Sequence, residues 1–338
     1  MKFGAVPLDQ AEGKILGHNI AGPDGQRALR KGKPLSADDV AALSALGRGL
    51  VYVAELTPDD VHEDLAARRI AEAVKGGGLR LSGPSSGRAN LLAEAPGMLR
   101  VDRETVIGVN DCEGITLATA LPGFVRARQI AATVKIIPFA VSESLLRRAE
   151  GIATENQPAI HIDPLAAQPV GLVLAGSASI RERLTADFAP LVERVEALGS
   201  HVACTEHVSV EGDDAELELA QTIARLRETG MRLIILAGET AIMDRQDIAP
   251  RAIERAGGLV ETLGAPVDPG NLLMLAYLDG IPIVGAPGCA RSRKLNVVDW
   301  LLPRLLAGDR LSRADIAALG YGGLLDDVPE RPQPREQQ

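Results

Sequence analysis

Val170-Gly-Leu-Val-Leu-Ala-Gly-Ser177 is a continuous apolar run that ends at a glycine and a serine. A short run without polar interruption is typical of a strand buried on both faces, as in a parallel sheet. The period of an amphipathic helix follows over 180–198, and apolar runs and helical periods then alternate to about residue 306. This alternation predicts an α/β fold in the C-terminal half, with a mostly parallel sheet between two layers of helices.

The other elements of this half are predicted from the same signals. Strands are expected at 201–205, 233–237 and 282–285, and helices at about 214–228, 247–256 and 292–306. Open parallel sheets bind ligands beyond the carboxyl ends of their strands. The loops that directly follow the strands are therefore where functional residues are expected.

The N-terminal half shows a mixed α+β pattern. Ser36 precedes an apolar-periodic run that predicts a capped helix, and residues 50–54 predict a strand. Thr57-Pro-Asp-Asp60 is expected to open a second helix that ends before the glycines at 76–78. Short apolar runs separated by turn residues over 79–140 predict a strand-rich segment.

Three prolines between 157 and 169 mark a domain boundary, because proline interrupts both helices and sheet ladders. At 338 residues the chain is long enough for two domains, each with its own core. We therefore expect a mixed α+β domain over 1–157, an α/β domain over 169–325 and a flexible tail over 326–338.

Composition and charge exclude several classes of protein. The net charge is −9 and aromatic residues make up 2% of the chain, which argues against a nucleic-acid partner. No membrane-spanning apolar run or signal-peptide core is present, so a cytoplasmic protein without membrane contact is expected. No strand is followed by Gly-x-Gly-x-x-Gly, and no Gly-x-x-x-x-Gly-Lys-Ser/Thr motif occurs, which disfavours a Rossmann oxidoreductase and a nucleotide hydrolase.

The first candidate loop, residues 237–247, lies between an apolar strand and a helix. Its Gly238 and Thr240 can present backbone N–H groups and a hydroxyl to an anion. Asp244 and Asp247 can hold a metal ion or polarise a bound group. The alternative is that Asp247 only caps its helix, and the spacing leaves both interpretations open.

The second candidate loop is Pro266-Val-Asp-Pro-Gly-Asn271. Pro269-Gly270 fits the centre of a type II turn, which would leave Asp268 and Asn271 on either side with their side chains in the loop. The alternative is a simple connecting turn.

The third candidate loop, residues 285–294, again lies between a strand and a helix. Pro287-Gly288 is followed by a cluster of one hydroxyl and three cations: Arg291, Ser292, Arg293 and Lys294. Cations, a hydroxyl and free backbone donors together favour a phosphate or oxyanion site. The alternative is a solvated basic turn.

Residues 170–306 resemble the molybdopterin-binding domain shared by MoaB/Mog-type proteins and molybdopterin molybdotransferases. The segment Gly238–Arg251 is similar to the family's glycine- and hydroxyl-rich loop, with Asp247 in the place of its functional acidic residue. Val210-Glu-Gly-Asp-Asp214 is similar to its other acidic stretch. Glu239 is a departure, because it puts a negative charge where a phosphate loop usually avoids one.

The whole chain resembles a bacterial molybdopterin-binding module that is sometimes joined to a cytidylyltransferase-like domain. The resemblance is greatest over 267–273, 285–292 and 320–325. It implies a molybdopterin-binding protein of molybdenum cofactor biosynthesis, which binds molybdopterin or its nucleotide form. Whether the chain is also a molybdotransferase- or nucleotidyltransferase-like enzyme stays open. The alternative is a non-catalytic carrier or chaperone that delivers the cofactor to molybdoenzymes or to a cytidylyltransferase partner. A homo-oligomer is a further expectation.

The resemblance also implies a set of site residues. Asp214, Asp244 and Asp247 are the candidates for catalysis, and Asp244 and Asp247 for a magnesium ion. The candidates for binding the pterin and its phosphate are Gly238, Glu239, Thr240, Asp268, Pro269, Gly270, Asn271, Pro287, Gly288, Arg291, Ser292 and Lys294.

Overall fold

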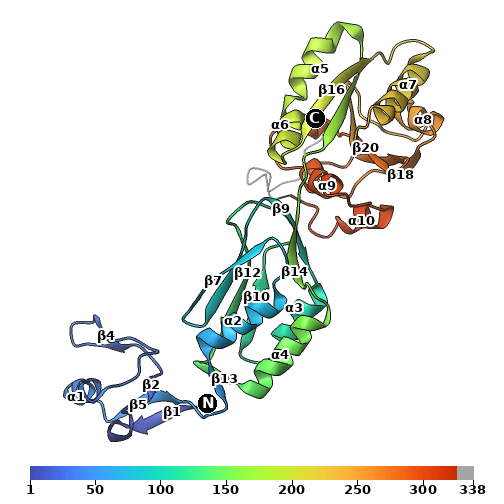
Figure 1. Ribbon diagram of the computed structural model, residues 1–338. Coiled ribbons are helices and arrows are strands. Elements are labelled where there is room, and N and C mark those ends of the chain that lie inside the picture. Colours follow the sequence, from blue (N-terminus) through green and yellow to red (C-terminus); the bar gives the residue numbers. More distant parts are fainter. Residues whose placement is uncertain (326–338) are drawn as a thin grey trace. The chain divides into compact units, whose positions relative to one another are not determined.

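The computed structural model describes residues 1–325, and the expected flexible tail over 326–338 lies outside this range. The chain divides into two compact units (Figure 1). The first comprises Met1–Ala95 and Leu99–Asp163, and the second comprises Pro96–Met98 and the chain from Pro164 onward. No helix within residues 1–325 is both long enough and apolar enough to span a bilayer.

The first unit begins with a small antiparallel sheet in the order β1 (Lys2–Pro7), β5 (Leu50–Glu55) and β2 (Ile15–Leu16). The short strands β3 (Ile20–Ala21) and β4 (Arg27–Leu29) pair beside it, and a 3-10 turn spans Leu8–Gln10. Helix α1 (Ala37–Ala45) begins at Ser36, whose side chain forms a reciprocal capping box with Asp39. The predicted capped helix and the predicted strand are confirmed.

The rest of the first unit packs helices on antiparallel strands. One sheet has the order β10 (Ile115–Thr119), β12 (Ile130–Ile136), β8 (Arg88–Ala93) and β7 (Leu79–Ser85). A second has the order β11 (Gly123–Val125), β9 (Gly97–Val101) and β14 (Ile160–Pro164), and the helices are α2 (Glu63–Val74), α3 (Arg103–Asn110) and α4 (Glu143–Glu155). The strand-rich segment expected over 79–140 is confirmed, with α3 inserted in it.

The prediction that Thr57 opens a helix is wrong. Residues 60–62 form β6 (Asp60–His62), which pairs with β13 (Ala140–Ser142), and the helix begins only at Glu63. Thr57 instead donates from its backbone N and its hydroxyl to Asp60 Oδ2, at 2.7 and 2.8 Å. Pairing with a strand that is distant in the sequence therefore overrides the local start signal.

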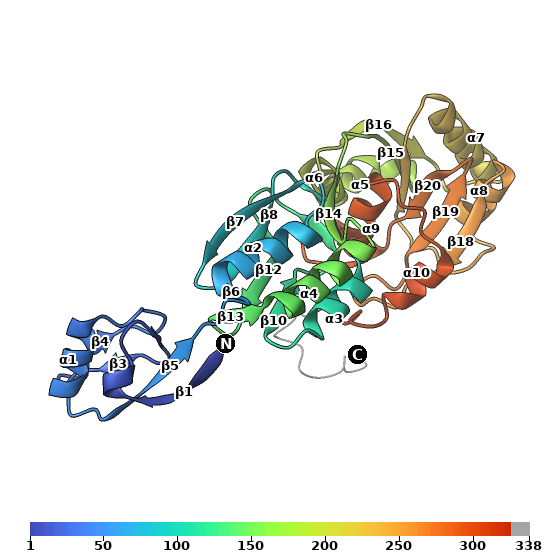
Figure 2. The same ribbon diagram turned by 60° about the horizontal axis from the view of Figure 1, so that its bottom comes forward.

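The second unit is built on one six-stranded sheet, of which β20, β19 and β18 can be followed side by side in Figure 2. Its order is β16 (His201–Val208), β15 (Pro169–Ala175), β17 (Leu233–Gly238), β20 (Ile281–Gly285), β19 (Met274–Leu278) and β18 (Leu259–Leu263). The first four strands are parallel, and β19 runs antiparallel to both of its neighbours. The mostly parallel sheet is confirmed, and β18 and β19 extend it.

Helices cover both faces of this sheet because its strands are apolar on both sides. Leu172 and Leu174 of β15 belong to a core formed with α6 (Ala189–Ala197) and α9 (Val297–Leu306). Val173, between them, belongs to a core formed with α7 (Ala215–Glu228) and α8 (Ile248–Arg255). The alternation of side chains along the strand thus separates two cores, and the predicted three-layer α/β architecture is confirmed.

Two helices of this unit differ from the prediction. The helix expected over 180–198 is divided into α5 (Arg181–Asp187) and α6, which meet at Phe188, because Pro190 in the first turn of α6 lacks an N–H for the preceding turn. The helix expected from 292 begins only at Val297, after the 3-10 turn η3 (Gly288–Arg291). Short helices at Ala178–Ile180 and at α10 (Arg313–Ala318) complete the unit.

Candidate functional site

The order of the parallel strands creates a switch point between β15 and β17. From β15 the chain passes through α5 and α6 to β16 on one side, whereas β17 pairs with the other side of β15 and leads toward β20. The loops that leave β15 and β17 therefore diverge at their carboxyl ends. In open α/β sheets this is the position of the ligand crevice.

All three candidate loops begin at this carboxyl edge. The first follows β17 and the third follows β20, and these two strands are parallel neighbours. The second follows β18, which runs parallel to β20 because two antiparallel steps separate them. The topology thus brings the three loops to one edge of one sheet.

A cavity of about 310 Å³ opens beside the loop that follows β17. Gly238, Thr240 and Asp247 are the predicted site residues that line it. The rest of its wall is mainly apolar and is contributed by Ala175, Val210, Leu219, Leu236, Ala237, Ala241, Ile242, Ile248, Ala249 and Ala286. An apolar wall with a few polar groups is the usual composition of a small-molecule pocket.

Asp247 shapes the loop that follows β17. Its Oδ2 accepts hydrogen bonds from the backbone N atoms of Met243 and Asp244, at 2.6 and 3.0 Å. Asp247 is the N-cap residue of α8, but its side chain makes no capping hydrogen bond to that helix. The interpretation of Asp247 as only a helix cap is therefore wrong, because its carboxylate binds the backbone of the loop and not that of the helix.

The other two candidate acids stand apart from this cavity. Asp244 Oδ1 accepts from the backbone N of Gln246 at 2.8 Å, and Asp214 is the exposed N-cap residue of α7 without a side-chain cap. Neither residue lines the cavity. Within residues 1–325 no three or more His, Cys, Asp or Glu side chains come together in a group that could hold a metal ion.

Glu239 connects the two loops that diverge at the switch point. Its Oε2 accepts hydrogen bonds from the backbone N and the hydroxyl of Ser177, at 3.1 and 2.9 Å. These hydrogen bonds are the main reason why the pKa of the Glu239 carboxyl is below its ordinary value. The adjacent Gly238 is required for close approach, because a Cβ there would lie 2.9 Å from the carbonyl oxygen of Ala175.

Arg291 brings a cation from the third loop to the first. Its Nη2 donates to the carbonyl oxygen of Gly238 at 2.7 Å, and its guanidinium carbon lies 4.9 Å from the centroid of the Phe188 ring. Its Nε is buried and has no hydrogen-bond partner within the described chain. A buried N–H without a partner is unfavourable, so Arg291 is held here at some cost in free energy.

The neighbours of Arg291 differ in how they are held. Arg293 forms an ion pair with Glu193. Ser292 Oγ accepts from the backbone N of Lys294 at 3.1 Å, and the Lys294 side chain is exposed. Gly288 is open, since a Cβ built there would meet no atom within 4 Å. Pro287 is buried as the N-cap residue of η3.

The loop with Pro269 and Gly270 is not the type II turn that was predicted. The Asp268–Pro269 peptide is cis, and the φ of Gly270 is +142° rather than the roughly +80° that a type II turn requires. The backbone N of Asp268 donates to Gly323 O at 2.8 Å, and that of Val297 donates to Pro269 O at 3.2 Å. Asp268, Pro269, Gly270 and Asn271 all lie outside the lining of the 310 Å³ cavity.

Sequence reasoning missed Arg194, which holds the third loop in place. Its Nη1 and Nη2 donate to four backbone carbonyl oxygens, and two of these acceptors, Ser292 and Lys294, are predicted site residues. The sequence carries no distinct signal for this role, because Arg194 is one of three arginines within 180–198.

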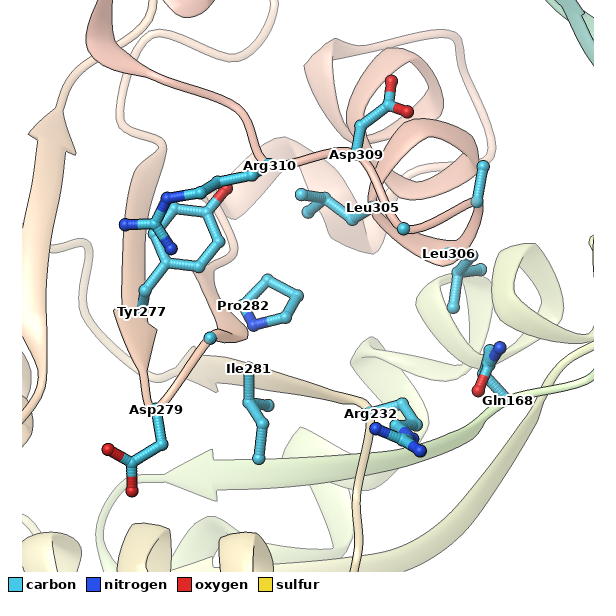
Figure 3. Close-up of a pocket in the computed structure, with 13 residues that line it drawn as sticks. Gln168, Arg232, Tyr277, Asp279, Ile281, Pro282, Leu305, Leu306, Asp309 and Arg310 are labelled. Atoms are coloured by element: carbon cyan, nitrogen blue, oxygen red, sulfur yellow. The ribbon is translucent and has the colours of Figure 1, made fainter.

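Two further cavities flank the sheet. One of about 270 Å³ is lined by Ser177, Arg181, His207 and Ser209 among others, and burial is the main reason why the pKa of His207 is lowered. The other, of about 470 Å³, lies at the opposite edge, where the parallel strands begin (Figure 3). There Arg310 stacks on the Tyr277 ring, 4.2 Å from its centroid, and Arg232 lies on the opposite side. The larger cavity is thus remote from the switch point.

Comparison with known proteins gives a family only for a small part of the chain. Residues 5–55 match a family model described as a domain of unknown function, DUF8806. No curated protein matches the chain.

The chain is similar to several solved structures of molybdenum cofactor biosynthesis proteins. For one such protein from Pyrococcus furiosus the identity is 12% and the TM-score 0.25, over 94% of this chain and 65% of that one. For the molybdopterin biosynthesis MoeA protein from Pyrococcus horikosii the identity is 11% and the TM-score is 0.31, and the match covers 91% of this chain and 75% of that one. For a molybdenum cofactor biosynthesis protein B the identity is 15% and the TM-score is 0.27, and the match covers 43% of this chain and 90% of that one. At these identities and TM-scores the likenesses carry no argument about activity, so the function of this chain has to be inferred from its own residues.

Proposed function

We propose that this chain binds a phosphorylated pterin, molybdopterin or its nucleotide form, at the carboxyl edge of its C-terminal sheet, as part of molybdenum cofactor biosynthesis. The observation that carries the proposal is the meeting of Arg291 with Gly238 at the switch point, directly beside a largely apolar cavity. A cation with an unused buried donor suits a phosphate, and the cavity suits a planar ring.

In this proposal the third loop binds the phosphate. Arg291 donates from its free Nε, while Ser292, Lys294 and the open backbone at Gly288 complete the anion site. Gly238 and Thr240 line the cavity that receives the pterin, together with its apolar wall. We assign no pterin contact to Asp268 or Asn271, because both lie outside that cavity.

The same site is compatible with a transferase activity. Asp247 is the acidic residue that lines the cavity, and a magnesium ion would be held there by its carboxylate together with phosphate oxygens of the ligand. Such an ion would neutralise phosphate charge. The chain's own part is to fix the carboxylate, which the backbone N atoms of Met243 and Asp244 do.

The alternative is a carrier or chaperone that delivers the cofactor to a molybdoenzyme or to a cytidylyltransferase partner. One observation favours this alternative. Asp247 Oδ2 accepts hydrogen bonds from the backbone of its own loop, so the carboxylate has a structural role that requires no catalysis. If Asp247→Asn abolishes cofactor maturation while pterin binding persists, the carrier alternative fails.

Binding is tested by fluorescence titration with 6-hydroxymethylpterin phosphate and with unphosphorylated 6-hydroxymethylpterin. The wild-type chain should prefer the phosphate ester, and Arg291→Ala combined with Lys294→Ala should remove that preference. Arg293→Ala is the matched control, because Arg293 is paired with Glu193. Equal affinity of the wild-type chain for both probes would refute the phosphate site. Pterins that copurify from a cofactor-producing host would then identify the natural form.

A further inference from the structure

The carboxylate of Glu239 is fixed between the two loops that diverge at the switch point. Glu239 belongs to the loop that follows β17, and its carboxylate accepts two hydrogen bonds from Ser177, which follows β15. The two loops are in close contact there, because a Cβ built on Gly176 would lie 3.3 Å from the Cβ of Glu239. The carboxylate is therefore held between the two loops that diverge at the switch point.

The same carboxylate lies within the electrostatic field of two arginines. Arg183 and Arg291 both contribute to the lowering of the Glu239 pKa, after the larger effect of the Ser177 hydrogen bonds. Arg291 also approaches the backbone of this residue, with Nη2 at 3.4 Å from the Glu239 carbonyl oxygen. Arg291 is thus close to Glu239 and on the same side of the switch point, and its charge favours the ionised form of the carboxyl.

The position of this contact relates it to both cavities at the carboxyl edge. Ser177 lines the cavity of about 270 Å³, whereas Gly238 and Thr240, on either side of Glu239, line the cavity of about 310 Å³. A phosphate bound by Arg291 would lie near Glu239, because Nη2 of Arg291 is 3.4 Å from the carbonyl oxygen of that residue. Like charges at this range repel each other, and more strongly near the protein than in bulk water.

We propose that Glu239 is a built-in counter-anion of Arg291 that opposes phosphate binding, rather than a residue that contacts the ligand. This inference rests on the proposed function and concerns how tightly that site binds any phosphate. A phosphate dianion that also contributes its pterin ring can outcompete the carboxylate. A free inorganic anion has only its charge to offer and is held weakly. Glu239 therefore weakens the binding of every phosphate by a similar factor, and a ligand occupies the site only if its organic part adds binding free energy of its own.

Glu239→Gln separates the charge from the hydrogen bonds, because the amide oxygen can still accept from Ser177. We expect this variant to bind 6-hydroxymethylpterin phosphate and inorganic phosphate roughly five- to tenfold more tightly, the size of one screened charge interaction. Its affinity for unphosphorylated 6-hydroxymethylpterin should not change. Glu254→Gln, which removes an exposed charge on α8, is the matched control and should change neither affinity.

Ser177→Ala distinguishes the effect of the Glu239 charge from the effect of the link between the two loops. It removes the hydrogen bond from the Ser177 hydroxyl and leaves the Glu239 carboxylate in place. Its affinity for the phosphate ester should stay close to that of the wild-type chain. The inference is overturned if Glu239→Gln binds the phosphate ester equally or more weakly, or if Ser177→Ala tightens binding as much as Glu239→Gln does. If the wild-type chain and Glu239→Gln bind neither pterin, the proposed function itself is wrong, and the inference falls with it.

Discussion

Arg194 on α6 donates its Nε to Asp299 Oδ1 at 2.8 Å, which joins α6 to the first turn of α9. Asp299 also accepts the backbone N of Asn296 at 2.9 Å, as part of the capping box of α9. With its other nitrogens Arg194 binds the carbonyl oxygens of Pro190, Ala290, Ser292 and Lys294. One largely buried guanidinium therefore orders the whole loop that carries the proposed phosphate site.

Arg194→Ala should destabilise the second unit and weaken phosphate binding together. Loss of hydrogen bonds from a charged, largely buried donor costs about 2–4 kcal/mol in unfolding free energy. Urea unfolding gives the stability, and titration with 6-hydroxymethylpterin phosphate gives the affinity. Arg293→Ala is the comparison, because solvent screens its exposed pair with Glu193 and the stability should change little. An Arg194→Ala protein with unchanged affinity would show that the loop does not depend on this side chain.

Gly270→Ala should destabilise the second unit. The φ of Gly270 is +142°, and a Cβ there would lie 2.5 Å from the Cβ of Val297 at the start of α9. The strained backbone and the overlap should together cost roughly 1–3 kcal/mol. Gly288→Ala provides the control for stability, since an added Cβ meets no atom within 4 Å and no positive φ is involved. Equal urea midpoints for the two variants would contradict the close packing of this loop on α9.

Asp247→Asn and Asp247→Ala should differ in pterin binding. Asparagine keeps an oxygen that can accept from the backbone N atoms of Met243 and Asp244, so the loop around the cavity should persist. Alanine leaves both N–H groups without this acceptor, and the affinity for 6-hydroxymethylpterin phosphate should fall roughly tenfold. The two affinities are compared by fluorescence titration. Equal losses in both variants would mean that the charge of Asp247, not its hydrogen bonds, is what the ligand requires.

The first unit should lose stability in acid through Glu143. Hydrogen bonds from Arg69 and then Arg147 lower the pKa of Glu143 from 4.5 to about 2. Because the folded pKa lies below the unfolded one, the stabilisation is complete above pH 4.5 and is lost as the pH falls toward 2. Urea midpoints at about pH 6 and about pH 3 should differ less for Glu143→Gln than for the wild-type chain. If the two urea midpoints differ by the same amount in both proteins, Glu143 does not contribute to the loss of stability in acid.

Much of the second unit was predictable because its signals are local. Continuous apolar runs and helical periods identified the strands β15, β17 and β20 and the helices α7 and α8 almost to their ends. The loops after β17 and β20 were identified as functional candidates for the same reason. Local signals failed where a distant partner decided the outcome, as at Thr57, where residues 60–62 pair with β13.

By itself, the sequence determined the fold class and the placement of Gly238, Asp247 and Arg291 in loops at strand ends, since these follow from side-chain periodicity along the chain. Only the tertiary structure decided that Arg291 reaches Gly238, that Glu239 binds Ser177 and that Arg194 orders the third loop. Each of these contacts joins residues more than fifty positions apart. Which charges meet depends on strand order and loop paths, which no local pattern of residues encodes.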